Sequence, residues 1–127
     1  SLRLHLAVQI VDQDLFNCGV SGTECPVMVK LTYEDNEGFP HEWLKGFYAN
    51  ADPSGRTPVH CVTCPPPTSG PHVRIQPDTW ITYDSPNLIQ VFNEAGIKAA
   101  TISAIEIYAS GHSYTSLVSE VELLAQE

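Results

Sequence analysis

The chain has few basic residues. Lys and Arg number 6 against 15 Asp and Glu, which gives a formal charge of −9 and a pI near 4.8. Because such a surface repels phosphate at neutral pH, we expect no nucleic-acid partner. The sequence has no run of about eighteen apolar residues and no basic amphipathic stretch, so we expect no membrane insertion.

An initiator methionine is also missing, since the sequence begins at Ser1 and enters an alternating pattern at once. Such a start is typical of a processed secreted protein or of a module cut from a longer chain, so we expect an extracellular or cell-surface location. The 127 residues, 43% hydrophobic and 17% charged, match one ordinary globular domain. We therefore expect a single domain over residues 1-127.

Apolar and polar residues alternate along several segments, a period of two that places one face of a strand on a core. The clearest segment carries Leu2, Leu4, Leu6, Val8 and Ile10 on one face. The other expected strands are Val27 to Tyr33, Glu42 to Ala49, Val73 to Ile75, Trp80 to Tyr83, Thr101 to Tyr108 and Leu117 to Leu124. About eight short strands, without a helix long enough to cover a parallel sheet, predict an all-β antiparallel sandwich of jelly-roll type.

Turn residues predict how neighbouring strands connect. Glu34 to Gly38 predicts a hairpin between the second and third strands, and the polar stretch Ala109 to Tyr114 predicts a hairpin loop between the last two. The residues expected to face inward on those last two strands are Ile105, Ile107, Leu117, Val121 and Leu123. We also expect the first and last strands to pair, which would bring the termini together.

Two segments have an irregular composition. Asn50 to His72 is rich in Pro, Gly, Ser, Thr and Cys, which predicts a long loop that is either functional or braced by cross-links. Ser85-Pro86 is typical of a helix N-cap followed by proline at the first helical position. Asn87 to Asn93 fits either a single helical turn or an edge strand.

The segment Ile105 to His112, followed by Leu117 to Leu123, resembles the closing strand pair of galactose-binding-like jelly rolls, the superfamily that holds many carbohydrate-binding modules. Val27 to Ala49, with Trp43 in its second half, is similar to the central strands of such modules. The same arrangement occurs in C-terminal β domains of extracellular bacterial proteins. The resemblance implies binding to sugars, cell-surface glycans or other proteins, and in many members a structural calcium.

The four cysteines are Cys18, Cys25, Cys61 and Cys64, all in expected loops. In an oxidising compartment an even set of this kind indicates two disulfides. We favour Cys18 with Cys25 and Cys61 with Cys64, although the sequence equally allows bridges between the two loops.

A zinc site is the alternative for the second pair of cysteines. His60 and His72 flank Cys61 and Cys64 at a spacing that metal knuckles use, and thiolates are soft ligands. A thioredoxin-type redox role is not expected, because such motifs open a helix and here three prolines follow.

Aromatic side chains could supply flat platforms for sugar rings, with neighbouring polar groups bonding the hydroxyls. The candidate ligand contacts are Trp43, Tyr48, Trp80, Tyr83, His112 and Tyr114. For Trp43 and Trp80 the competing interpretation is a core position, because aromatic residues favour half-buried pleated surfaces. His112 and Tyr114, in an expected loop, are better candidates for an exposed contact.

Asp12, Asp14 and Glu120 lie near expected strand ends and are candidate calcium ligands, with solvated surface acids as the default interpretation. Without a nucleophile elbow or a glycine loop that could hold phosphate, the sequence favours binding over catalysis. Two hypotheses result: a glycan-binding module of an extracellular bacterial protein, or a structural or adhesive surface subunit that acts through self-association or contacts with other surface proteins.

Overall fold

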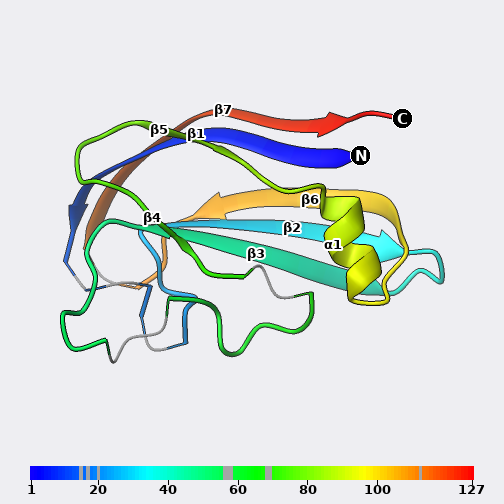
Figure 1. The fold of residues 1–127 in the computed structure, drawn as a ribbon, viewed down its shortest axis with the longest axis horizontal. Coiled ribbons are helices and arrows are strands. Elements are labelled where there is room, and N and C mark those ends of the chain that lie inside the picture. The colour runs from blue at the N-terminus through cyan, green and yellow to red at the C-terminus, as the bar shows by residue number, and fades with distance from the viewer. Residues whose placement is uncertain (15, 17, 20, 56–58, 68–69, 112) are drawn as a thin grey trace.

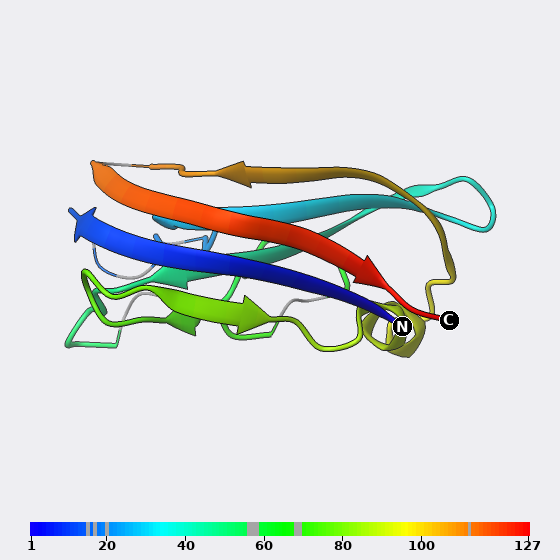
Figure 2. The ribbon, with the colours of Figure 1, turned by 90° about the horizontal axis from the view of Figure 1, so that it is seen from above.

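The computed structural model describes residues 1–14, 16, 18–19, 21–55, 59–67, 70–111 and 113–127. Two sheets, with strand orders β5-β1-β7 and β4-β3-β2-β6, pack face to face (Figures 1 and 2). The elements are β1 (Leu2–Gln13), β2 (Val27–Asp35), β3 (Pro40–Tyr48), β4 (Val73–Arg74), β5 (Ile81–Asp84), α1 (Leu88–Glu94), β6 (Ala99–Tyr108) and β7 (Tyr114–Ala125). The expected all-β sandwich is confirmed, with seven strands in the described ranges; β3 and β4 pair in parallel and the other pairs are antiparallel.

The core lies between the two sheets. The inward face of β1 is buried as expected, from Leu2 to Ile10. Across the sandwich it meets Trp43 and Phe47 of β3 and the apolar face of β2. Each aliphatic side chain buried here stabilises the fold by roughly 1.5–3 kcal/mol relative to exposure.

Two expected pairings are confirmed. β2 and β3 form a hairpin in which Glu34 opposes Pro40, and Gly38 occupies the turn with a positive φ of 87° that favours glycine. β1 pairs with β7 over its whole length. The termini therefore lie side by side, joined by a hydrogen bond from the Ser1 amino group to the carbonyl of Gln126 (Figures 1 and 2).

The expected hairpin between the last two strands is wrong. β6 pairs with β2 in one sheet, whereas β7 pairs with β1 in the other. The stretch after Tyr108 therefore crosses between the sheets. Tyr114, expected in that loop, is the first residue of β7. The separation gives β1 a partner on both of its edges, β5 and β7, and places Val118 and Leu123 of β7 on the core.

The inward face of β7 also differs from the expectation. Val118 and Leu123 pack on the core, so Leu123 alone of the three expected residues is inward. Leu117 and Val121 are exposed instead.

A β-bulge causes this difference. Between the pairs Ala7–Ser119 and His5–Glu122, two residues of β7, Glu120 and Val121, stand opposite one residue of β1. The alternation of β7 therefore shifts by one residue at this point, and no uniform period of two can describe it.

The two inward residues expected on β6 differ in burial. Ile105 packs on the core, but Ile107 is 37% exposed. Ile107 pairs with the buried Val29 and so lies on the same face of the sheet. Because β6 is an edge strand, the opposite sheet covers Ile107 less completely than it covers the neighbouring Val29.

The segment that fitted either a helical turn or an edge strand forms α1, which buries Leu88 and Phe92 at one end of the sandwich (Figure 1). The expected cap at Ser85-Pro86 is wrong, because Asn87 is the N-cap. The Ser85 hydroxyl instead accepts a hydrogen bond of 2.9 Å from the backbone N–H of Leu4, and so satisfies a backbone donor of β1. No helix in the described part of the chain is long and apolar enough to cross a membrane.

The long loop before β4 contains no helix or strand among its described residues, as expected. Lys45, which is only 7% exposed, donates a hydrogen bond of 3.0 Å from Nζ to the Pro71 carbonyl, and burial lowers the pKa of Lys45 to about 8. The disulfide Cys61–Cys64 closes a short turn within this loop. The disulfide Cys18–Cys25 closes a turn in the segment between β1 and β2.

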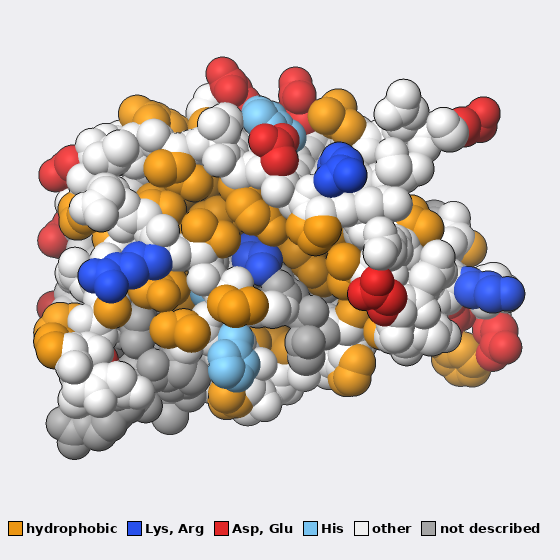
Figure 3. Space-filling view, in the orientation of Figure 1, with side chains coloured by type: hydrophobic (Ala, Val, Ile, Leu, Met, Phe, Trp, Pro, Cys, Tyr) orange, Lys and Arg blue, Asp and Glu red, His pale blue; other side chains and the backbone are white. Residues whose placement is uncertain are grey.

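On the side of the molecule that Figure 3 shows, hydrophobic side chains gather between the two sheets.

Candidate functional site

The expected aromatic contacts separate by burial. Trp43 is 1% exposed and Tyr48 is also buried, so both belong to the interior. Tyr83 is half-buried and meets Phe47 edge to face at a centroid distance of 5.2 Å. The structure therefore does not place these three side chains on a binding surface.

The two residues expected in an exposed loop give no platform either. The Tyr114 hydroxyl donates a hydrogen bond of 2.7 Å to the Glu24 carbonyl, so this half-buried side chain braces the neighbouring loop. His112 lies outside the described residues.

Trp80 is the exception, because 49% of it is exposed. The register explains its direction: Ile81 pairs with the buried Val8 and points inward, whereas Thr82 pairs with Ala7 and points outward. Since successive residues of an extended chain alternate in direction, Trp80 shares the outer side with Thr82. The core interpretation is thus correct for Trp43 and wrong for Trp80.

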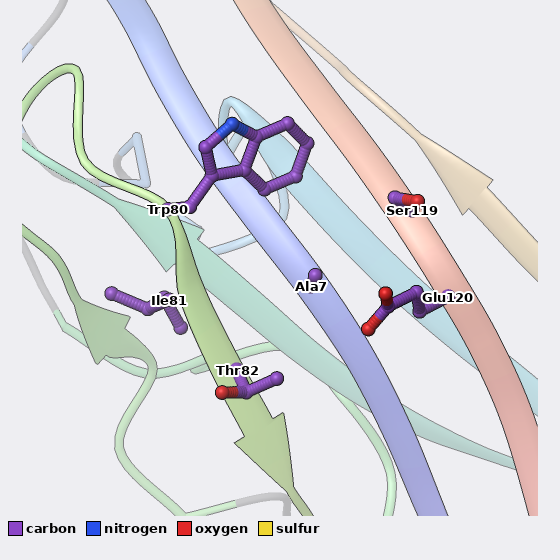
Figure 4. Close-up of a pocket in the computed structure, with 6 residues that line it drawn as sticks. All are labelled: Ala7, Trp80, Ile81, Thr82, Ser119 and Glu120. Carbon is purple, nitrogen blue, oxygen red and sulfur yellow. The ribbon is translucent and has the colours of Figure 1, made fainter.

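A shallow hollow of about 320 Å³ lies beside this tryptophan on the outer face of the sheet β5-β1-β7. Its lining residues are Ala7, Trp80, Ile81, Thr82, Ser119 and Glu120. Figure 4 shows the indole lying across β1, with the small Ala7 side chain as the floor and Glu120 on the far side. Because Ala7 is short, the residues on both neighbouring strands stand above it.

Glu120 reaches the hollow through the β-bulge. Its φ is 54°, a left-handed conformation that is uncommon for residues other than glycine. Bulges of this kind redirect a side chain within a strand. In Figure 4 the Glu120 carboxylate extends from β7 toward Ala7, so it faces the hollow from the side opposite Trp80.

An ion pair lies on the same face, next to the hollow along β1. His5 Nδ1 and Asp84 Oδ1 are 2.6 Å apart, and the register places these residues opposite each other. The hydrogen bond to Asp84 raises the pKa of His5 against the opposing effect of desolvation, and the charges of Glu122 and Glu120 raise it further. Acidic residues of both β5 and β7 therefore act on His5, which lies between these strands on β1.

The expected calcium ligands Asp12, Asp14 and Glu120 are exposed and do not come together. Asp12 pairs with Thr115 near one end of β7, whereas Glu120 is five residues further along. That separation corresponds to about 16 Å of strand, which is too far for one ion.

The expected zinc set is not assembled among the residues that the structure describes. Cys61 and Cys64 form a disulfide, which leaves no thiolate to bind the metal. His72 lies against the other disulfide with both ring nitrogens hydrogen-bonded to the backbone, and His60 is exposed.

One group of potential metal ligands does lie together in the described ranges: Cys18, Cys25 and His72, with ligand atoms within 4.8 Å of one another. The two sulfurs are joined in a disulfide. Both ring nitrogens of His72 are hydrogen-bonded to the backbone, at Gly46 and Gly22. This group is therefore a structural brace.

Sequence reasoning missed the polar neighbours of Trp80. A signal for them exists, since Ile81 and Tyr83 are apolar and alternate with Thr82 and Asp84. The direction of Ser119 and Glu120 could not be predicted in this way, because Ser119 follows the β1–β7 register, in which it opposes Ala7, and Glu120 lies in the β-bulge.

This face offers an indole for stacking, hydroxyl groups from Thr82 and Ser119, and the carboxylate of Glu120 as a hydrogen-bond acceptor. Comparison with protein-family models, with curated proteins and with solved structures finds no match for this chain. The function therefore has to be inferred from the chemistry of this face.

Proposed function

We propose that this chain is a non-catalytic glycan-binding module in which Trp80 supplies the platform for a sugar ring. The observation that carries the proposal is the half-exposed indole beside a shallow polar hollow. Removing the apolar surface of the indole from water is favourable, and a sugar ring stacked on it would bury that surface. The hydroxyls of Thr82 and Ser119 lie where they can orient such a ring.

The proposed fold type is the galactose-binding-like jelly roll that the sequence resembles. Two features support this assignment: the first and last strands are neighbours in one sheet, and the connection from β6 to β7 crosses between sheets. An extracellular or cell-surface location, in a bacterial protein, is part of the proposal. The two disulfides support the location, because such bonds persist mainly in oxidising compartments.

The proposal is tested by affinity electrophoresis of the oxidised protein through gels that contain individual soluble polysaccharides. Retardation in at least one gel, lost in Trp80→Ala, is the expected result. Phe39→Ala is the matched control, because Phe39 is 60% exposed but lies at the β2–β3 turn, away from the hollow.

Circular dichroism and urea unfolding establish that both variants are folded. Equal mobility of wild type and Trp80→Ala in every gel would overturn the proposal. A loss of retardation in Phe39→Ala as large as in Trp80→Ala would also contradict it, since the binding would then not depend on the proposed face.

Self-association is the second candidate function, favoured by one observation. β7 is a long edge strand, and Leu117, Val121 and Leu124 on it are exposed. An unpaired edge with apolar side chains can pair with a second copy. Light scattering after size-exclusion chromatography tests this: a mass that rises with concentration and returns to the monomer in Leu124→Lys supports it, and a monomer at all concentrations contradicts it.

A further inference from the structure

The outer face around Trp80 is longer than one sugar ring. Trp80, Thr82 and Asp84 face outward in succession, and the register places the last two beside Ala7 and His5 of β1. Trp80 and Asp84 are four positions apart along extended chain, which corresponds to about 13 Å. A ligand that touches both ends is therefore a chain of several sugar units.

The two ends of this face differ in chemistry. At one end lies the exposed indole, with the exposed Leu117 on the outer side of β7. The other end is acidic: Asp84 of β5 and Glu122 of β7 stand opposite His5, and Glu120, which faces the hollow, lies between this end and Trp80. Figure 3 shows acidic side chains gathered around a histidine along the edge of the molecule formed by β1, β5 and β7.

Part of this negative charge has no salt-bridge partner among the described residues. Asp84 pairs with His5, but neither Glu120 nor Glu122 forms a salt bridge within the part of the chain that the structure describes. The guanidinium of Arg3 keeps its charge, but it donates a hydrogen bond to the Ser85 carbonyl and forms no salt bridge with these carboxylates in the described ranges. The acidic end can therefore attract a cation from the ligand.

We infer that the ligand is an oligosaccharide with free amino groups, stacked on Trp80 and held through its ammonium groups by Glu120 and Glu122. This inference rests on the proposed function and narrows it to a ligand class. Ammonium groups supply the charge that the acidic end lacks, and they donate charge-assisted hydrogen bonds to carboxylates. Sulfated and uronic-acid glycans are disfavoured, because their charge has the same sign as this face and as the whole chain.

The test uses oligomers of glucose, N-acetylglucosamine and glucosamine that have equal length and the same linkage, so that only one substituent per ring differs. Binding is measured by titration calorimetry at mildly acidic pH, at which the amino groups are protonated. The glucosamine oligomer is expected to bind most tightly. Its advantage should shrink when salt is raised from about 0.15 M to about 1 M, because screening weakens exposed ion pairs.

The variants assign the effect to this face. Glu120→Gln and Glu122→Gln should each lower the preference for the glucosamine oligomer by about two- to fivefold, the range of an exposed ion pair. Glu106→Gln is the matched control: it removes the same charge from β6, in the other sheet, and should leave the preference unchanged. Trp80→Ala should abolish binding of the oligomer.

The outcomes separate this inference from the proposed function. If the three oligomers bind equally well and Trp80→Ala still abolishes binding, the amino-sugar inference is overturned and the proposed function stands. If no oligomer or polysaccharide binds in a way that depends on Trp80, the proposed function fails as well. Equal binding of a lysine oligopeptide, or an equal loss in Glu106→Gln, would overturn the inference in favour of general attraction to an acidic chain.

Discussion

The backbone N–H of Gly46 donates a hydrogen bond of 2.7 Å to Nδ1 of His72. Because Nδ1 accepts, the ring proton resides on Nε2, which donates to the Gly22 carbonyl at 2.8 Å. A neutral, buried imidazole thus joins the end of the long loop to β3 and to the loop around the Cys18–Cys25 disulfide.

We expect His72 to make the protein less stable in acid. Burial lowers the pKa of His72 below its ordinary value of 6.5; the hydrogen bond to Gly22 opposes this shift, while the charges of Lys45 and His60 add to it. The unfolded chain therefore binds the proton more readily than the folded one. The stability contributed by neutral His72 is complete above pH 6.5 and is lost as the pH falls through the lowered pKa.

Urea unfolding between neutral and acid pH measures this contribution. The free energy of unfolding of the wild type should fall more steeply with acid than that of His72→Gln, which does not titrate there. His60→Gln, at an exposed position, is the control and should stay close to the wild type, with a slightly smaller fall in acid because the charge of His60 adds to the lowering of the His72 pKa. The pKa of His5 is raised, so its contribution has the opposite sign and cancels in the comparison of variants. Parallel curves for wild type and His72→Gln would contradict the prediction.

Gly46→Ala should destabilise the protein by about 3 kcal/mol, because an added methyl group cannot fit. Its Cβ would lie 2.3 Å from the sulfur of Cys25 and 3.0 Å from the His72 ring. Gly55→Ala is the control, since open space surrounds that position and only its positive φ opposes the side chain, at a cost of about 1 kcal/mol. Equal losses in urea unfolding would show that the contact at Gly46 is not tight.

Asn87→Ala should cost about 1–2 kcal/mol, at the upper end of the range for an N-cap. The Asn87 side-chain oxygen accepts from the backbone N–H of Ile89 at 3.2 Å and of Leu2 at 3.0 Å, so it caps α1 and also holds the start of β1. Asn87→Asp keeps the acceptor and should recover most of the loss. Asn93→Ala, at an exposed position of the same helix, should be nearly neutral; a similar cost for both alanine variants in thermal unfolding would contradict the role of the cap.

Local patterns in the sequence predict the strands better than they predict the pairing of distant strands. The alternation through Leu2 to Ile10 and the turn before Gly38 act over a few residues, so both predictions are confirmed. The partners of β6 and β7 depend on which distant strand offers a free edge, which no local pattern encodes. The bulge at Glu120 is equally hidden, because glutamate is not a residue that marks a left-handed conformation.

The candidate site follows the same division. Trp80 alternates in step with the polar Thr82 and Asp84, which implies that it points outward. Its proximity to Glu120 can be predicted only from the β1–β7 register together with the bulge. The sequence could therefore predict the platform but not the acidic group beside it.

The two disulfides should differ in their response to a mild reductant. Cys18 and Cys25 are both fully buried, next to His72 and in one apolar cluster with Tyr48, whereas Cys64 is only half-buried. Thiol–disulfide exchange requires a thiolate to reach a sulfur, so Cys61–Cys64 should open first. Stepwise reduction with dithiothreitol, followed by alkylation and peptide mass spectrometry, measures the order.

Loss of the two bonds should also have unequal consequences. Opening Cys61–Cys64 releases a short loop and should lower the free energy of unfolding by about 2 kcal/mol, without effect on ligand retardation, because Trp80 lies on the opposite sheet's outer face. Removing Cys18–Cys25 should cost more, since His72 and Gly46 pack directly on its sulfurs. If Cys18 and Cys25 were alkylated first under native conditions, the loop around them would open more readily than its burial implies, and the bracing role assigned to His72 would fail with it.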